Sequence, residues 1–154
     1  MKRRVPRMND QESAAWLGLT TAFQLLPAAL DRQLQRDSRL THFEFVVLST
    51  LQLSPDPAMR MTALAEATVA TLPRLSHVCG RLEKRGLVTR TSCPDDRRAT
   101  NVGLTGDGRR ELIHSVPGHI ATARRLVIDA LTPEQLDSLT EIMGTINARL
   151  ADEV

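Results

Sequence analysis

The stretch from Leu72 to Thr105 constrains the fold of this chain most strongly. Its apolar residues first recur at helical spacing and then at every second position, as in strands. At about 100° per residue, the helical part places four apolar side chains on one stripe, with polar and basic residues on the other face: Leu75, Val78, Cys79 and Leu82. We therefore expect a short helix that buries one face and leaves a basic face free.

The residues after this helix predict a two-stranded hairpin. Gly86 follows two cations and is suited to a left-handed helix end. Residues 87–92 and 99–104 alternate as strands do, and the intervening 93–98 segment has proline and aspartate, which favour a tight turn. Arg97 and Arg98 lie at its tip. A helix sized for the major groove beside a basic hairpin sized for the minor groove indicates a DNA-binding module.

The same stretch resembles a known family. Asp96-Arg97-Arg98, five residues and then Leu104-Thr105 match the D-x-R-x5-L-T signature of the MarR (multiple antibiotic resistance regulator) winged-helix repressors. The run LEKRGLV at 82–88, Gly108 and the LAE run at 64–66 are similar to that family's pattern. The resemblance implies a homodimeric, DNA-binding transcriptional regulator, expected to be a repressor that acts on a pseudo-palindromic operator in double-stranded DNA.

The expected fold is mainly α with a small β-hairpin wing, in a single domain of residues 1–154. A winged helix-turn-helix module at about 40–105 is flanked by long dimerisation helices at about 13–36 and 106–154. The last helix carries an apolar seam at steps of three and four, which is typical of helix pairing: Leu136, Leu139, Met143, Ile146 and Leu150. Packing of these seams within one chain is the alternative to a homodimer.

Local signals predict where the helices begin and bend. Thr41 and Thr132 each have capping-box spacing, and Thr105 is suited to cap the long helix that follows it. Thr62 is expected to cap a short helix over 63–68, and Pro27 is expected to bend the first helix. Residues 1–10 are expected to form a mobile arm, and Pro117-Gly118 could divide the long helix.

Composition narrows the partners and the location. The net charge is only +2, but the segment from Leu72 to Arg110 alone carries +5, as expected of a surface that binds phosphates. No uninterrupted run of 18 apolar residues and no secretory signal is present, so a cytoplasmic protein without a membrane segment is expected.

The candidate DNA-binding residues are the polar and basic residues of the predicted helix and hairpin. Asp96 is expected to orient Arg98, the pairing that the family motif implies. Arg98 is expected in the minor groove, and Ser76, His77 and Arg81 in the major groove. The full set is Arg74, Ser76, His77, Arg81, Lys84, Arg90, Arg97 and Arg98.

No catalytic motif is recognisable, so we expect no enzyme and no cofactor. Cys79 is expected to be a buried apolar residue, whereas Cys93, near arginines, is a candidate redox-sensing thiol. The histidines at positions 42, 114 and 119 lack further ligands at metal-binding spacing, and no metal site is expected.

A regulator usually responds to a signal. Members of the resembled family often bind small aromatic anions between the dimer helices and the DNA-binding module, so the resemblance implies release by a small aromatic or phenolic ligand. Two alternatives stay open at this point. One is a thiol-based redox regulator, and the other is a winged-helix adaptor that binds proteins without reading DNA.

Overall fold

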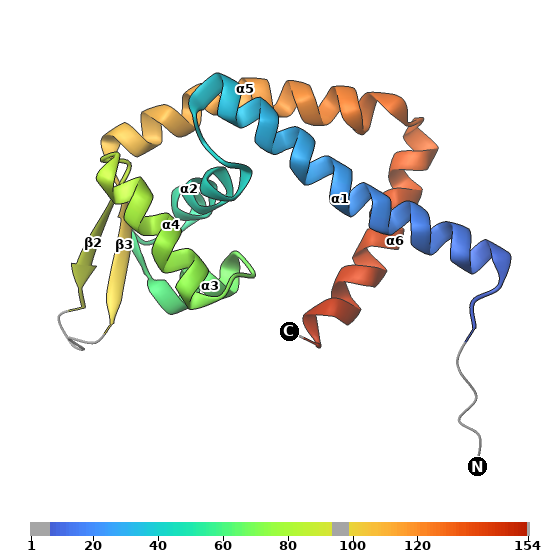
Figure 1. Ribbon diagram of the computed structural model, residues 1–154, viewed down its shortest axis with the longest axis horizontal. Coiled ribbons are helices and arrows are strands. Elements are labelled where there is room, and N and C mark those ends of the chain that lie inside the picture. The colour runs from blue at the N-terminus through green and yellow to red at the C-terminus, as the bar shows by residue number, and fades with distance from the viewer. Residues whose placement is uncertain (1–6, 94–98, 154) are drawn as a thin grey trace, which may run out of the picture.

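A computed structural model describes residues 7–93 and 99–153 of the chain. Helices α1 and α5 run side by side and form the top of an arch (Figure 1). One end of the arch carries a small α/β module, and the other carries the first half of α1 together with α6 (Figure 1). The elements in chain order are α1 (Asp10–Ser38), α2 (His42–Leu53), β1 (Ala58–Arg60), α3 (Met61–Ala67), α4 (Leu72–Lys84), β2 (Val88–Ser92), β3 (Thr100–Leu104), α5 (Gly106–Leu126), η1 (Ile128–Ala130) and α6 (Pro133–Ala151).

The predicted hairpin is confirmed in its strands, but it belongs to a three-stranded antiparallel sheet in the order β1-β3-β2. The third strand, β1, was not predicted, because it has just three residues and no visible alternation. Gly108 explains how α5 packs on this sheet. A Cβ atom at Gly108 would clash with the carbonyl oxygen of Leu87, so only glycine allows α5 to begin so close to β2.

Most predicted helix starts are confirmed. The hydroxyl groups of Thr41, Thr105 and Thr132 each accept a hydrogen bond from the backbone N–H three residues later. At Thr41 and Thr132 the capping box is complete, because the side chain three residues later accepts the backbone N–H of the threonine in return. The Thr62 cap was wrong. Helix α3 begins two residues before the predicted start, at Met61, and its N-cap residue, Arg60, makes no side-chain capping bond.

The two long helices differ from expectation at their ends. Helix α1 begins at Asp10, where Asn9 and Glu12 form a capping box, so residues 9 and 10 are not part of an arm, and residues 1–6 lie outside the described residues. The same helix continues through Pro27. Helix α5 likewise continues through Pro117 and ends at Leu126, before a short 3-10 turn. Pro117-Gly118 therefore does not divide its helix.

The hydrophobic core lies in the small module, where α2, α3, α4 and the sheet meet the second half of α1 and the start of α5. Its most completely buried apolar residues are Leu34, Leu40, Val47, Leu48, Leu64, Leu75, Cys79, Leu82, Val88 and Val102. The other end of the arch has no such core, since no described residue of α6 is buried. There Trp16, Phe23 and Ile142 are each more than half exposed.

Helix α1 is long and apolar enough to cross a membrane when judged by length and composition alone. Its most apolar window has a mean hydropathy of 1.2, and 6% of that window is buried. The expectation of no membrane segment was based on the lack of a long uninterrupted apolar run. In α1, polar residues such as Thr20, Thr21 and Gln24 interrupt the apolar stretch. A helix with an exposed apolar face is equally expected at a subunit interface, and the second half of α1 packs against α5.

Candidate nucleic-acid interface

Helix α4 is held in place at both ends by local hydrogen bonds. Thr71 caps its start, and Pro73 occupies the first turn, where a missing N–H costs little. At its end, Gly86 adopts a left-handed φ of 74° and donates to the Glu83 carbonyl over 2.9 Å. The N–H of Leu87 reaches back to the Leu82 carbonyl, also over 2.9 Å. This pair of bonds is a Schellman motif, so the glycine stop is confirmed.

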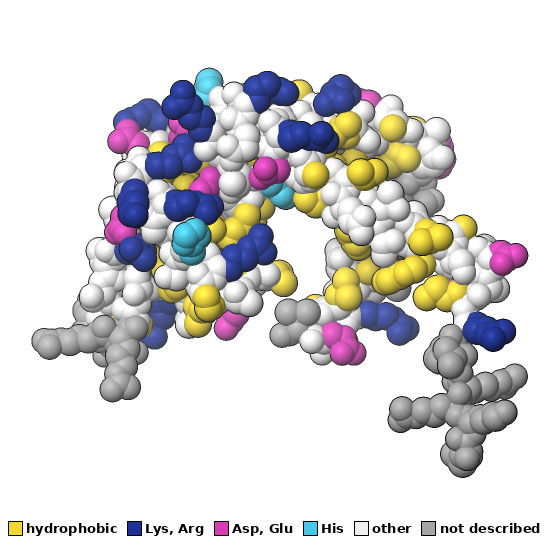
Figure 2. Space-filling view, viewed as in Figure 1, with side chains coloured by type: hydrophobic (Ala, Val, Ile, Leu, Met, Phe, Trp, Pro, Cys, Tyr) yellow, Lys and Arg dark blue, Asp and Glu magenta, His cyan; other side chains and the backbone are white. Residues whose placement is uncertain are grey.

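The predicted division of α4 into two faces is also confirmed. Leu75, Val78, Cys79 and Leu82 are all buried. The predicted contact residues on α4 are all exposed: Arg74, Ser76, His77, Arg81 and Lys84. Lys and Arg side chains gather over this end of the molecule, whereas large apolar patches cover the other end (Figure 2). The helix therefore presents a polar, cationic surface to solvent.

Two arginines of α4 lie on its flank against α2 and have partners there. The Arg81 guanidinium donates to a carboxylate oxygen of Glu44 over 3.1 Å, and the Glu44 side chain is only 5% exposed. The Arg74 guanidinium lies over the Phe43 ring, 4.1 Å from its centroid, in a cation–π contact. These contacts help to set the rotation of α4 about its own axis. If Arg81 contacts the major groove as predicted, its guanidinium must either bind DNA and Glu44 together or leave Glu44.

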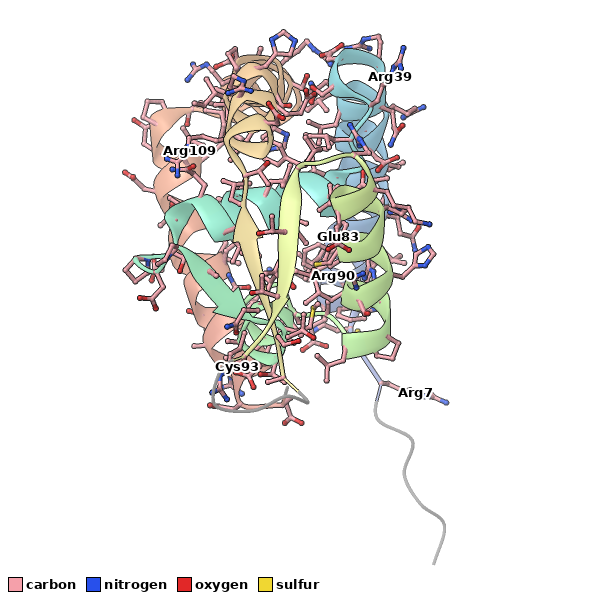
Figure 3. The ribbon with its side chains drawn as sticks, turned by 90° about the vertical axis from the view of Figure 1, so that its left-hand side faces the viewer. Arg7, Arg39, Glu83, Arg90, Cys93 and Arg109 are labelled. Carbon is pink, nitrogen blue, oxygen red and sulfur yellow. The ribbon has the colours of Figure 1, made fainter. Side chains whose placement is uncertain are left out.

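Arg90 joins the hairpin to the same helix. It projects from β2 and forms an ion pair with Glu83 of α4 at 2.7 Å (Figure 3). The hydrogen bond from Arg90 holds the pKa of the Glu83 carboxyl below its ordinary value. Arg90 therefore lies beside α4, and its charge is paired with a carboxylate that the sequence pattern did not reveal.

The hairpin tip, with Asp96, Arg97 and Arg98, lies outside the described residues. The strands that lead to it pair in register from Val88 opposite Leu104 to Ser92 opposite Thr100. The roles predicted for the tip residues therefore stay predictions.

Sequence reasoning missed three residues that shape this surface. Glu44, at the third position of the capping box that Thr41 begins, also binds Arg81 and lies 3.8 Å from Arg85. Phe43 supports the Arg74 guanidinium. Arg60, at the end of the unpredicted strand β1, is exposed beside the base of the hairpin. Of the three, only Glu44 stands in a motif that the sequence shows, the capping box that begins at Thr41.

The two cysteines are both buried. Cys79 lies in the core as predicted, and burial raises the pKa of its thiol to about 11. Cys93 directly follows β2 and is 6% exposed (Figure 3). Its sulfur lies 3.6 Å from the Arg60 guanidinium. The arginine matches the electropositive surroundings that a reactive thiol needs, but the low exposure limits the approach of an oxidant.

Two of the four histidines meet. The rings of His42 and His119 stack with centroids 6.0 Å apart, and His119 also contacts Phe45 at 4.3 Å. Burial lowers the pKa of both imidazoles, which favours their neutral form. Within residues 7–93 and 99–153, no group of three or more His, Cys, Asp and Glu side chains is placed to hold a metal ion.

A cleft of about 670 Å³ lies between α1, α2 and the flank of α4. Its volume is in the range of ordinary small-molecule sites. The cleft combines polar and charged groups, including the Asp31 carboxylate, with apolar ones, and its wall on α4 includes three residues predicted to touch DNA. The side chains that define this character are Pro27, Phe43, Val78, Arg74, His77 and Arg81.

The helix-turn-helix formed by α3 and α4, together with the adjoining sheet, defines a winged-helix DNA-binding protein. The sequence profile of the MarR family matches residues 40–100. Sco3205 of Streptomyces coelicolor, a MarR family transcriptional regulator solved in complex with DNA, is 41% identical over 93% of this chain and 90% of its own, with a TM-score of 0.87. This chain belongs to the MarR family of transcriptional regulators.

Two further structures extend the likeness. AbsC of Streptomyces coelicolor, another MarR family regulator, is 34% identical over 96% of this chain and 99% of its own, with a TM-score of 0.88. BpsR of Bordetella bronchiseptica, whose DNA binding is regulated by 6-hydroxynicotinic acid, is 26% identical over 87% of this chain and 98% of its own, with a TM-score of 0.77. The chain is therefore a DNA-binding transcriptional regulator and not an enzyme, as the sequence predicted.

Proposed function

We propose that this chain acts in the cytoplasm as a homodimer that binds a pseudo-palindromic operator and represses transcription. The observation that carries the proposal is the exposed polar face of α4, anchored at both ends, in a chain closely similar to a regulator solved with DNA. Ser76 and His77 would enter the major groove, while Lys84 and Arg90 would contact phosphates. Arg98, oriented by Asp96, would enter the minor groove.

The apolar surface at the other end of the arch supports a homodimer. Trp16 and Leu19 of α1 face Leu139 and Ile142 of α6 across an apolar groove. Large apolar side chains left exposed in this way are typical of a subunit interface. A symmetric pair would place two copies of α4 for half-sites about one helical turn apart.

Binding measurements test this function. The parent protein should select one sequence from random duplexes, and log K for that sequence should fall steeply with log[salt], by about 0.9 per phosphate contact. His77→Ala should cost about 1–3 kcal/mol on the selected sequence and leave an unrelated duplex unaffected. His114→Ala, which changes an exposed histidine of α5, is the control. Equal affinity for every duplex, or binding that is insensitive to salt, would support a protein adaptor instead.

We further propose that an aromatic acid in the cleft beside α4 releases the operator. The cleft offers Arg74 and His77 to a carboxylate and Phe43 to a ring. Because the same face of α4 would bind DNA, an occupant would compete with the operator for the position of these side chains. The regulation of BpsR by 6-hydroxynicotinic acid supports this ligand class.

A thermal-shift series tests the ligand proposal. Hydroxylated aromatic acids, including 6-hydroxynicotinic acid, should raise the Tm of the parent as their concentration rises, by mass action. An active compound should weaken operator binding roughly 5- to 150-fold, the usual range of allosteric coupling. Arg74→Gln should abolish both effects, whereas Arg110→Gln on α5 should leave them intact. A compound that stabilises the protein without changing operator affinity would contradict release through this cleft.

A further inference from the structure

The start of the DNA-binding helix carries exposed aliphatic side chains that the contacts proposed above do not use. Leu72, the first residue of α4, is 45% exposed, and Val69, in the turn before it, is 74% exposed. The two residues line the same surface hollow between α3 and α4, together with Ala65 and Ala70. Leu72 also lines a second hollow, beside Pro73 and Ser76. It therefore forms an apolar ridge between two depressions of the surface.

In the turn before α4, the exposed valine requires a strained backbone conformation. Val69 adopts a left-handed φ of 48°, which a β-branched residue rarely tolerates and which glycine adopts freely. Its side chain gains little from burial within the chain. A valine under these conditions supplies an apolar group at the surface where a glycine would supply none.

The surroundings of the ridge match the major groove of DNA. Arg60 lines the hollow that Leu72 shares with Ser76, and Arg74 lies two residues further along α4, whereas the exposed Glu66 lines the other hollow, beside Val69. On the Arg60 side of Leu72, the occupant should therefore carry negative charge next to a small apolar group. A base pair shows one apolar group in the major groove, the 5-methyl group of thymine. In helix-turn-helix proteins, the N-terminal residues of the second helix contact the base edges.

We infer that Leu72, flanked by Val69, contacts the 5-methyl group of a thymine in each half-site and selects T·A at that position. This inference rests on the proposed function and names a determinant of its specificity. The contact would act by burying one methyl group against an aliphatic side chain. A hydrogen-bonding residue at position 72 could not make the same distinction, because deoxyuridine and thymidine carry the same donors and acceptors.

Deoxyuridine substitution tests the inference without altering the protein. The operator is first selected from random duplexes, and each thymine pair related by the two-fold axis is then replaced by deoxyuridine. At one pair, the parent should lose about three- to fourfold in affinity per half-site, or roughly tenfold for the dimer, the factor expected for one buried methyl group. The other pairs should show no change.

Substitutions at the start of α4 test whether Leu72 makes this contact. Leu72→Ala should bind the unmodified operator roughly tenfold more weakly and no longer distinguish thymine from deoxyuridine at that pair. Leu72→Met should restore the distinction. Leu53→Ala, which shortens a leucine that is 83% exposed at the end of α2, should behave as the parent does. Circular dichroism and Tm establish that each variant is folded.

The outcomes separate the inference from the proposed function. A selected operator at which no thymine responds to deoxyuridine overturns the inference alone. So does a Leu72→Ala variant that keeps the full distinction. If no sequence is selected at all, sequence-specific binding itself is wrong, and the thymine contact is overturned with it.

Discussion

At the scale of single residues, Val69 has a strained backbone that lowers the stability of the fold, while its exposed side chain serves the proposed contact with DNA. The left-handed conformation costs about 1–3 kcal/mol for a residue other than glycine, and more than half of the Val69 side chain is exposed. Sequence patterns could not predict this strain, because valine ordinarily argues against a left-handed turn. The position depends on the packing of α3 against α4, which both bury leucines in the core.

Val69→Gly should therefore stabilise the protein. We expect the free energy of unfolding to rise by about 1 kcal/mol, since relief of the strain exceeds the added entropy of glycine in the unfolded chain. Urea unfolding monitored by circular dichroism measures the change. Ala70→Gly, at a neighbouring position without a positive φ, should destabilise instead. A Val69→Gly protein less stable than the parent would show that the valine contributes more through contacts than it loses through strain.

At the scale of elements, α2 and α4 are joined through one buried carboxylate. Glu44 accepts the N–H of Thr41 over 2.8 Å as part of its capping box, and it also binds Arg81 of α4. A single side chain thus helps to cap the start of α2 and binds α4. The capping role could be predicted, because its partners are three residues apart. The second role could not, because Arg81 is 37 residues away.

Glu44→Gln isolates the second role, because glutamine still serves a capping box. We expect the free energy of unfolding to fall by about 1–2 kcal/mol, the cost of weakening a charged hydrogen bond to a buried group whose partner is half exposed. Urea denaturation provides the measurement. Glu83→Gln, which breaks the more exposed pair with Arg90, should change stability much less. Equal stability of Glu44→Gln and the parent would mean that this ion pair does not hold α4.

At the scale of the whole molecule, the arch has one end with a core and one end without. The DNA-binding module buries its own apolar residues, whereas no described residue of α6 is buried and the first half of α1 exposes large apolar side chains such as Trp16 and Phe23 (Figure 2). Apolar surface of this extent is more stable when a second copy covers it. We therefore expect the far end of the arch to be completed by dimerisation.

Ile142→Asp tests this expectation. Ile142 is 55% exposed in the single chain and lines the groove between α1 and α6. A charge there should raise the Kd of the dimer about a hundredfold or more, because a symmetric interface loses the burial of isoleucine twice. Sedimentation equilibrium measures the Kd, and Leu53→Asp in the DNA-binding module is the matched control. A parent protein that sediments as a monomer at micromolar concentration would contradict the dimer.

The sequence by itself determined the features that depend on neighbours in the chain. The caps at Thr41, Thr105 and Thr132, the stop at Gly86 and the buried stripe of α4 each involve residues within about one or two helical turns. Such hydrogen bonds and periodicities are encoded by spacing alone. For the same reason the strands of the hairpin and the exposed contact face of α4 could be predicted.

Only the tertiary structure decided which side chains meet across the chain. It brought strand β1 against β3, Glu44 to Arg81 and Phe43 to Arg74, and it required glycine at position 108 because of the Leu87 carbonyl. Spacing carries no record of these contacts, since each joins segments whose approach is set by the burial of a shared core. The arginines of α4 were thus predictable as exposed cations, whereas their partners depended on how the helices pack.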